Sequence, residues 1–321
     1  WLWSRSLDLL RPLLPPGTLL GDEISLDTKH IIAWVKENNP KEFIKGGRFH
    51  KERQPKGDPD CKVGFKANAN QTAAAPKTDG KPGSKARVGD YYWGYASGLV
   101  ATKVPHWGEV VLAEQTLPFD HGELSYFLPL MRQVEARLGR RPRFAALDAA
   151  FDAFYVYAYF HHAGGLAAVP LRNPGEPLRQ FTPTGLPLCA AGLPMPRKMI
   201  YRDRTHLLHH HCARYACPLC FPTASTTPCP IDHKSRAKGG CVTAMPTSVG
   251  TRLRSQLDRK GERFQQIYHQ RTATERIFSQ ALELGIERPK LRNGRSIANL
   301  NTLIYLTINL RTRQRIRQPA A

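Results

Sequence analysis

The sequence predicts a mixed α/β fold, in which a mixed sheet is flanked by helices and the chain is interrupted by a Cys/His-rich insertion. Three observations support this prediction. Extended apolar runs recur through residues 22–171, residues 122–138 repeat apolar side chains with a helical period, and residues 172–260 hold many prolines and most of the cysteines. The 321 residues, 41% of them hydrophobic, suffice for one large domain or two modest ones.

The first part of the chain predicts three strands. Residues 22–35 should form a strand, because apolar Ile24 and Leu26 alternate with polar residues. Residues 91–104 and 109–116 should form a hairpin around the turn at 105–108. Residues 51–90 are rich in Lys, Gly, Pro and Asn, which predicts a long, partly flexible basic loop with one short extended piece.

Helices and strands alternate in the rest of the chain. The helical period of residues 122–138 is followed by a fourth strand, a second helix and a fifth strand, at 143–147, 154–162 and 166–171. After the insertion, a helix should run from about Phe264 to Gly285, and a last helix from Ser296, as its N-cap, to about Arg315. Three antiparallel strands followed by alternating helices and strands is the element order of an RNase H-like fold.

These elements divide the chain into four segments. Residues 1–20 are expected to be the remnant of an N-terminal region, and residues 21–171 the first part of the core, including the flexible basic loop at about 50–90. Residues 172–262 form the Cys/His-rich insertion, and residues 263–321 complete the core with two helices, the last of them basic. Because the chain starts without Met and without the order of a signal peptide, we expect a fragment or a processed chain.

The charge of the chain predicts a polyanionic partner. The net charge is +21, and residues 251–321 alone carry 15 Lys+Arg against 5 Asp+Glu. DNA or RNA is the usual partner of such a chain. The apolar stretch at 297–310 is too short to span a membrane and contains three asparagines, so we expect no membrane partner and a soluble, cytoplasmic, nucleoid-associated protein.

Three acidic residues occupy positions that suit metal-dependent phosphoryl chemistry. Asp27 lies in the first predicted strand, Asp148 ends the fourth, and Glu275 lies in the helix after the insertion. An RNase H-like fold would bring the first and fourth strands together, and grouped carboxylates can hold a pair of divalent ions. A continuous helix would put Tyr268, Arg271 and Glu275 on one face. The alternative for that face is solvent exposure with an incidental ion pair.

Six segments of the chain resemble insertion-sequence transposases of the DDE class, which have an RNase H-like catalytic domain. One segment, Tyr268-x-x-Arg271-x-x-x-Glu275, looks like the Tyr-Arg-Glu signature of bacterial members. That family often has a Lys seven residues after the Glu, where this chain has Leu282. The other similar segments are residues 25–28, 92–95, 147–152, 279–293 and 296–305.

The resemblance implies an activity and its residues. Asp27, Asp148 and Glu275 would be the catalytic residues and would bind two Mg²⁺ or Mn²⁺ ions. The implied reaction is cleavage of DNA at the element ends by water, followed by attack of the 3′-hydroxyl on target DNA within a homodimer or a higher synaptic complex. Residues implied or expected to contact DNA are Tyr268, Arg271, Arg276, Lys290 and Arg292.

The insertion contains a group of residues with the spacing of metal ligands. Cys217-Pro-Leu-Cys220 is a knuckle-like pair, and a structural Zn²⁺ ion could bind within the set Cys212, Cys217, Cys220, Cys229, His233 and Cys241. The alternative is unliganded thiols in an irregular loop. Cys61 and Cys189 are expected to be packing residues.

Two functions of different classes therefore remain open. The first is a DDE-type transposase that cleaves and joins DNA with two metal ions. The second is a truncated or repurposed protein that binds DNA without cleaving it. Metal-dependent cleavage distinguishes them.

Overall fold

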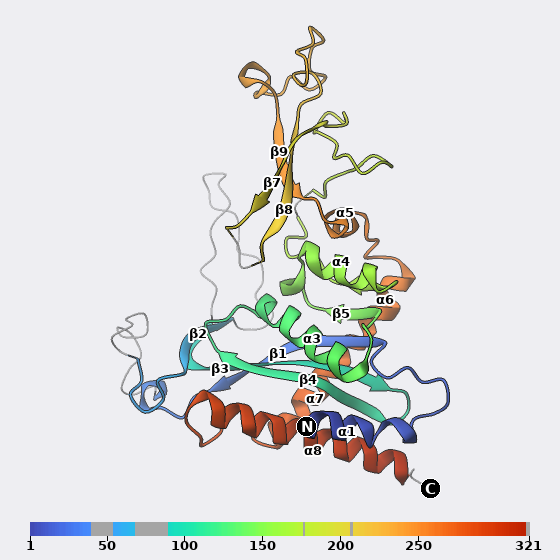
Figure 1. Ribbon diagram of the computed structural model, residues 1–321. Coiled ribbons are helices and arrows are strands. Elements are labelled where there is room, and N and C mark those ends of the chain that lie inside the picture. The colour runs from blue at the N-terminus through green and yellow to red at the C-terminus, as the bar shows by residue number, and fades with distance from the viewer. Residues whose placement is uncertain (40–53, 68–88, 176, 206–207, 319–321) are drawn as a thin grey trace. The chain divides into compact units, whose positions relative to one another are not determined.

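The computed structural model describes residues 1–39, 54–67, 89–175, 177–205 and 208–318 (Figure 1). The chain divides into two compact units: unit 1 contains residues 1–140 and 271–321, and unit 2 contains residues 141–270. The fold is mixed α/β, because strands pair both antiparallel and parallel and helices pack beside them. Residues 51–53 and 68–88 of the predicted basic loop lie outside the described residues.

Four antiparallel strands form the sheet of unit 1, and the first strand and the hairpin of the prediction are confirmed. The central strand is β3 (Gly89–Val104), which pairs with β1 (Glu23–Ile32) along one edge. Along its other edge it pairs first with β2 (Lys62–Ala67) and then with β4 (Gly108–Pro118). In the turn between β3 and β4, His106 and Gly108 both have positive φ. At Gly108 the absence of a side chain allows this conformation without strain.

Helices cover both faces of β3, and its side chains alternate between them. Leu99 and Ala101 belong to one buried cluster with α7 (Thr272–Glu283) and α8 (Gly294–Arg317). On the opposite face, the Tyr126 ring lies against Gly98, where an added Cβ would be 2.3 Å from the ring. Tyr126 ends η4 (Glu123–Tyr126), which leads into α3 (Phe127–Leu138) (Figure 1). The remaining helical elements of unit 1 are α1 (Leu2–Asp8), η1 (Arg11–Leu13) and η2 (Lys36–Asn38).

A polar side chain, that of Asn309, also binds α8 to the sheet through hydrogen bonds. The backbone N–H of Val111 donates to Oδ1 of Asn309 at 2.7 Å, and Nδ2 of Asn309 donates to the carbonyl of Val111 at 2.9 Å. Both residues are buried. Because one amide satisfies both backbone groups of Val111, Asn309 fixes the position of α8 along β4.

The helix predicted from Phe264 to Gly285 is wrong as a single element. It is divided into α6 (Glu262–Tyr268), the 3₁₀ turn η7 (His269–Arg271) and α7. The hydroxyl of Thr274 donates to the carbonyl of Arg271 at 2.9 Å, a local bond that competes with regular helix bonding. The N-cap predicted for the last helix is also wrong, because Asn293 accepts from the N–H of Ser296 at 2.9 Å and α8 begins at Gly294.

Unit 2 begins with a strand–helix–strand arrangement. Strand β5 (Phe144–Leu147) is followed by η5 (Ala149–Phe151), α4 (Phe154–His162) and β6 (Leu166–Ala168), which pairs parallel with β5. Helix α6 buries Phe264 and Ile267 with Ala168 of β6. These elements confirm the predicted fourth strand and second helix, whereas the fifth strand is shorter than predicted.

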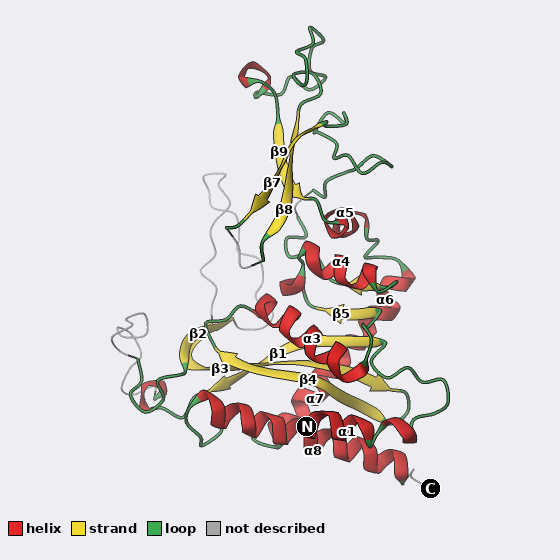
Figure 2. Ribbon diagram, in the orientation of Figure 1, coloured by secondary structure: helices red, strands yellow, loops and turns green. Residues whose placement is uncertain are grey.

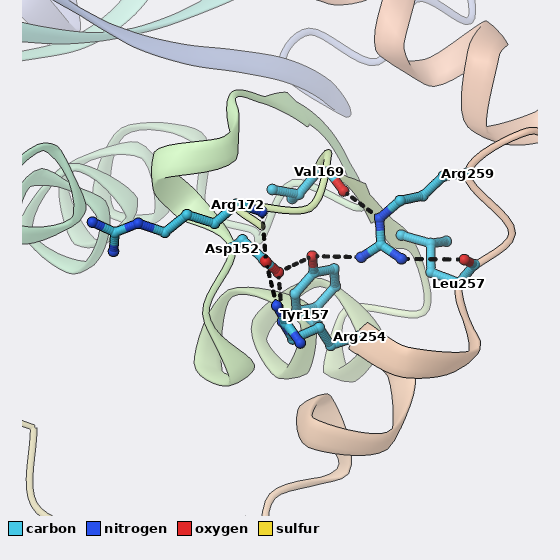
Figure 3. A network of polar contacts seen from close by, with 7 residues as sticks. All are labelled: Asp152, Tyr157, Val169, Arg172, Arg254, Leu257 and Arg259. Atoms are coloured by element: carbon cyan, nitrogen blue, oxygen red, sulfur yellow. Dashed lines mark hydrogen bonds and ion pairs between the residues drawn. The ribbon is translucent and has the colours of Figure 1, made fainter. Parts of the chain in front are cut away.

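A buried carboxylate joins the start of this arrangement to α5 (Val249–Gln256), as Figure 3 shows. The side chain of Asp152 has no exposed surface and accepts from Nε and Nη2 of Arg254 at 2.8 and 2.6 Å. Tyr157 and the N–H of Arg172 donate to it as well. Burial alone would raise the pKa of Asp152, but these hydrogen bonds hold it below its ordinary value. Asp152 is therefore a buried, ionised partner of Arg254.

The insertion contains a three-stranded antiparallel sheet that the sequence analysis missed. Its strands are β7 (Arg197–Asp203), β8 (His210–Ala216) and β9 (Val242–Pro246), with β8 in the centre. The long connection between β8 and β9 is almost entirely loop and turn, apart from η6 (Arg236–Lys238) (Figure 2). The strands escaped prediction because exposed and charged residues interrupt their apolar alternation.

Candidate functional site

Asp27 lies in the middle of β1, on the face that α7 covers. Ile31, four residues further along the strand, points to the same face and is buried against α7. The Asp27 side chain is 16% exposed; its Oδ1 accepts from the N–H of Thr28 at 2.8 Å, and its Oδ2 lies 3.5 Å from Nη2 of Arg271. Asp22, five residues earlier, pairs with Arg140 at 2.9 Å.

Arg271 and Glu275 are one helical turn apart at the start of α7. Ala273, Ile277 and Ala281 turn toward the core and anchor the helix beside β1, whereas Glu275 is exposed. Four residues correspond to about 6 Å along a helix axis. Arg271 contacts Asp27, and Glu275 lies one turn further along the helix with its side chain exposed. The structure brings Asp27, Arg271 and Glu275 into one unit.

Asp148 belongs to unit 2. It follows directly after β5 and caps η5, with its Oδ1 accepting from the N–H of Ala150 at 2.9 Å. The carboxylate is partly exposed at the C-terminal end of a parallel strand, where ligands of α/β proteins commonly bind. Two of the three candidate acids thus lie in unit 1, and the third lies in unit 2.

Tyr268, Arg271 and Glu275 do not lie on one continuous helix, because η7 separates α6 from α7. Tyr268 ends α6 and stacks on Phe264, with ring centroids 5.5 Å apart, so it belongs to unit 2. The prediction of a common face requires a continuous helix, and the 3₁₀ turn η7 changes the angular relation between the residues on either side of it.

The other candidate DNA contacts are exposed cations of unit 1. The Arg276 side chain is 66% exposed and lies 3.0 Å from the buried carboxylate of Glu109. Lys290 and Arg292 are exposed in the connection between α7 and α8, and the Arg292 guanidinium lies over the ring of Trp34 at 4.9 Å. A guanidinium beside an exposed aromatic ring can contact phosphates and bases together.

Three of the candidate zinc ligands lie together in unit 2. The Cys217 sulfur accepts from the backbone N–H groups of Leu219 and Cys241 and is hydrogen-bonded to the Cys220 and Cys241 thiols. Burial, and then the neighbouring thiols Cys217 and Cys189, raise the pKa of Cys241 to about 11. Burial opposes ionisation of Cys217 as well, but the donated hydrogen bonds lower its pKa below the ordinary value. Cys217 therefore ionises before Cys241.

The other predicted zinc ligands lie in two different places. Cys229 and His233 line a cavity of about 260 Å³ together with Cys189, Cys217 and Cys241. Cys212 lies on β8 in a separate group with Asp203 and His210, whose possible ligand atoms are within 4.8 Å of one another. Cys189, which was expected to be a packing residue, is half-buried in the wall of this cavity.

Comparison with known proteins gives no match to any protein-family model or curated protein. Among the described residues, no helix is long and apolar enough to cross a membrane.

Proposed function

We propose that this protein is a DDE-type transposase with an RNase H-like core, which cleaves DNA and joins the resulting 3′-hydroxyl end to a target strand. The observation that carries the proposal is the contact between Arg271 at the start of α7 and Asp27 in the middle of β1. It connects residues 25–28, which contain Asp27, with residues 268–275, although the two segments are far apart in the sequence. A contact between these two segments is expected if they serve one site.

The donor chemistry of the three acids suits Mg²⁺ or Mn²⁺, because these ions prefer carboxylate oxygens. Asp27, Asp148 and Glu275 would hold two such ions, which would stabilise charge on the attacking and leaving oxygens. The 3.5 Å contact between Arg271 and Asp27 is partly exposed, and ion pairs of that kind contribute only about 0–1 kcal/mol. Arg271 could therefore exchange this contact for a DNA phosphate.

The chain's own cations would position the DNA. Arg271 would hold the phosphate nearest to Asp27, and Arg276, Lys290 and Arg292 would bind the flanking backbone from their exposed positions. Tyr268 would contact DNA from unit 2. Fixing the scissile phosphate relative to the carboxylates converts an intermolecular reaction into one between oriented groups, which accounts for much of the catalysis in phosphoryl transfer.

The proposal is tested with duplexes that carry the DNA flanking the coding sequence, incubated with Mg²⁺ or Mn²⁺ and a target plasmid. We expect metal-dependent cleavage and joining of the 3′-hydroxyl end. The variants Asp27→Asn, Asp148→Asn and Glu275→Gln should each reduce cleavage by at least about 100-fold while retaining DNA binding. Glu283→Gln, an exposed acid further along α7, is the matched control and should retain activity.

The remaining outcomes identify the alternatives. Equal cleavage by the wild type and Glu275→Gln would remove Glu275 from the site. DNA binding without cleavage by the wild type would favour a non-catalytic DNA-binding protein, and cleavage without joining would favour a nuclease.

A further inference from the structure

We propose that Asp203, His210 and Cys212 bind one Zn²⁺ ion on the small sheet of unit 2, with a water molecule as the fourth ligand. A carboxylate oxygen, an imidazole nitrogen and the thiol sulfur of these residues lie within 4.8 Å of one another. Ligands bound tetrahedrally to zinc at about 2.0–2.3 Å are about 3–4 Å apart, so a small inward shift completes the site. The proposal concerns unit 2 alone and does not depend on the strand-transfer activity.

The pairing of β7 with β8 places the three side chains on one face of the sheet. Asp203 ends β7 and lies directly opposite His210, the first residue of β8. Directly opposite side chains of an antiparallel pair share a face, with Cβ atoms about 4.5–5.5 Å apart. Cys212 lies two residues after His210, and side chains two residues apart along a strand also share a face. The register of the two strands therefore brings the three side chains together.

The surroundings of His210 suit a metal ligand. Its Nδ1 lies 2.8 Å from the carbonyl oxygen of Leu208. A carbonyl oxygen can only accept, so Nδ1 carries the proton and Nε2 holds the lone pair with which a neutral imidazole binds zinc. Metal-ligating histidines are commonly oriented by a backbone carbonyl in this way. The ring of Phe154 packs beside the imidazole, with ring centroids 4.8 Å apart, and restricts its rotation.

Hydrogen bonds orient the other two ligands as well. The N–H and the hydroxyl of Thr205 donate to Oδ1 of Asp203 at 2.8 and 2.6 Å. Tyr201 lies opposite Cys212 in the ladder, and its hydroxyl donates to the Cys212 sulfur. Groups that are hydrogen-bonded to metal ligands fix the ligand positions in the same manner. The three side chains are therefore held near one another before an ion binds.

The donor atoms favour zinc over the lighter divalent ions. A thiolate, an imidazole and a carboxylate together suit Zn²⁺, whereas Mg²⁺ and Ca²⁺ prefer ligands that are all oxygen. Cys212 is buried, but Asp203 and His210 are only half-buried, so the ion and a water molecule can approach from their side. Zinc sites with three protein ligands and a water keep one position open. The ion would also join the last residue of β7 to the first residue of β8.

The test is a Zn²⁺ titration of the full chain, produced without a polyhistidine tag, in competition with a chromophoric chelator. We expect about one Zn²⁺ per chain at this site. Asp203→Asn, His210→Gln and Cys212→Ser should each weaken its binding at least about 10-fold, because losing a group that only orients a ligand already costs that much. His211→Gln is the matched control, since it alters an exposed side chain on the opposite face of β8, and it should bind zinc like the wild type.

Replacing zinc by Co²⁺ tests the thiolate ligand, because a sulfur bound to cobalt gives a charge-transfer band. The band should be lost in Cys212→Ser and retained in Cys220→Ser, which removes a thiol outside the group. Hydrogen exchange in β5 and β6 verifies that unit 2 remains folded in each variant. Asp203→Asn and His210→Gln alter half-buried side chains, so they test the site independently of the buried Cys212.

Three results would overturn the proposal. The first is a wild-type chain that binds no Zn²⁺ in the titration. The second is an equal loss of affinity in His210→Gln and the control His211→Gln. The third is a cobalt band that persists in Cys212→Ser and disappears in Cys220→Ser.

Discussion

The buried Glu114 provides a sharp prediction for the pH dependence of unit 1. Its carboxyl group lies inside the sheet on β4, where the hydroxyls of Ser97 and Thr116 donate to Oε1 at 3.1 and 2.5 Å. Ser97 is also hydrogen-bonded to the buried hydroxyl of Tyr305 on α8. Burial raises the pKa of Glu114 from 4.5 to about 7, and the hydrogen bonds offset only part of that effect.

The sign and size of the effect follow from this shift. The folded chain keeps the Glu114 proton between pH 4.5 and 7, whereas the unfolded chain loses it, so stability falls as pH rises through this range. The contribution is complete below pH 4.5 and is lost above pH 7. A shift of that size corresponds to about 3 kcal/mol. Glu114→Gln cannot ionise and retains an oxygen acceptor, so it should avoid this loss.

The assay is urea unfolding monitored by tryptophan fluorescence. Because all five tryptophans belong to unit 1, the signal reports the unfolding of unit 1 alone. The difference in unfolding free energy, Glu114→Gln minus wild type, should increase by about 3 kcal/mol between pH 4.5 and pH 8. Taking the difference cancels the titration of groups that both proteins share. Glu283→Gln, which alters an exposed carboxylate, should show no such trend. A difference that stays constant with pH would refute the reasoning.

Three further predictions concern other buried polar groups. Asn309→Ala should destabilise unit 1 by about 2–4 kcal/mol, because it leaves the buried N–H and carbonyl of Val111 without partners. The control Asn299→Ala alters an exposed side chain and should have little effect. Equal effects of the two substitutions in urea unfolding would contradict this prediction. Asp152→Asn should cost about 3 kcal/mol, because Arg254 loses its buried counter-ion, and hydrogen exchange in α4 should accelerate; unchanged exchange would exclude the role. Burial lowers the pKa of His30 to about 4, so its contribution to stability is present above pH 6.5 and lost as pH falls toward 4. His30→Gln should reduce this acid loss, and an acid dependence equal to that of the wild type in urea unfolding would count against it.

The sequence predicted the fold best where local patterns and tertiary packing agree. The hairpin of β3 and β4 was predictable, because long apolar runs flank a turn that contains Gly108. The continuous helix across 264–285 was not found, because the period alone does not reveal the 3₁₀ turn at His269–Arg271. The strands of the insertion were missed because exposed and charged residues interrupt their apolar alternation, so the strands depend on pairing with one another and not on a local pattern.

For the candidate sites too, local patterns were predictable from the sequence, whereas contacts between distant segments were not. The spacing of Cys217 and Cys220 predicted that they lie on one turn, and the hydrogen bond from the N–H of Cys220 to the carbonyl of Cys217 confirms the turn, whereas zinc binding stays a prediction. For the acids, the pattern identified Asp27 and the segment that contacts it, and the contact itself required the packing of α7 on β1.

The proposed function requires that Asp27, Asp148 and Glu275 bind the same divalent ions. Iron-mediated cleavage of the polypeptide tests it directly, with Fe²⁺ in place of Mg²⁺, peroxide and ascorbate as reagents, and mass spectrometry to locate the cuts. The account predicts cuts next to all three residues, suppressed together by excess Mg²⁺ and together weakened in Glu275→Gln. Cuts next to Asp148 alone, unchanged in Glu275→Gln, would contradict it.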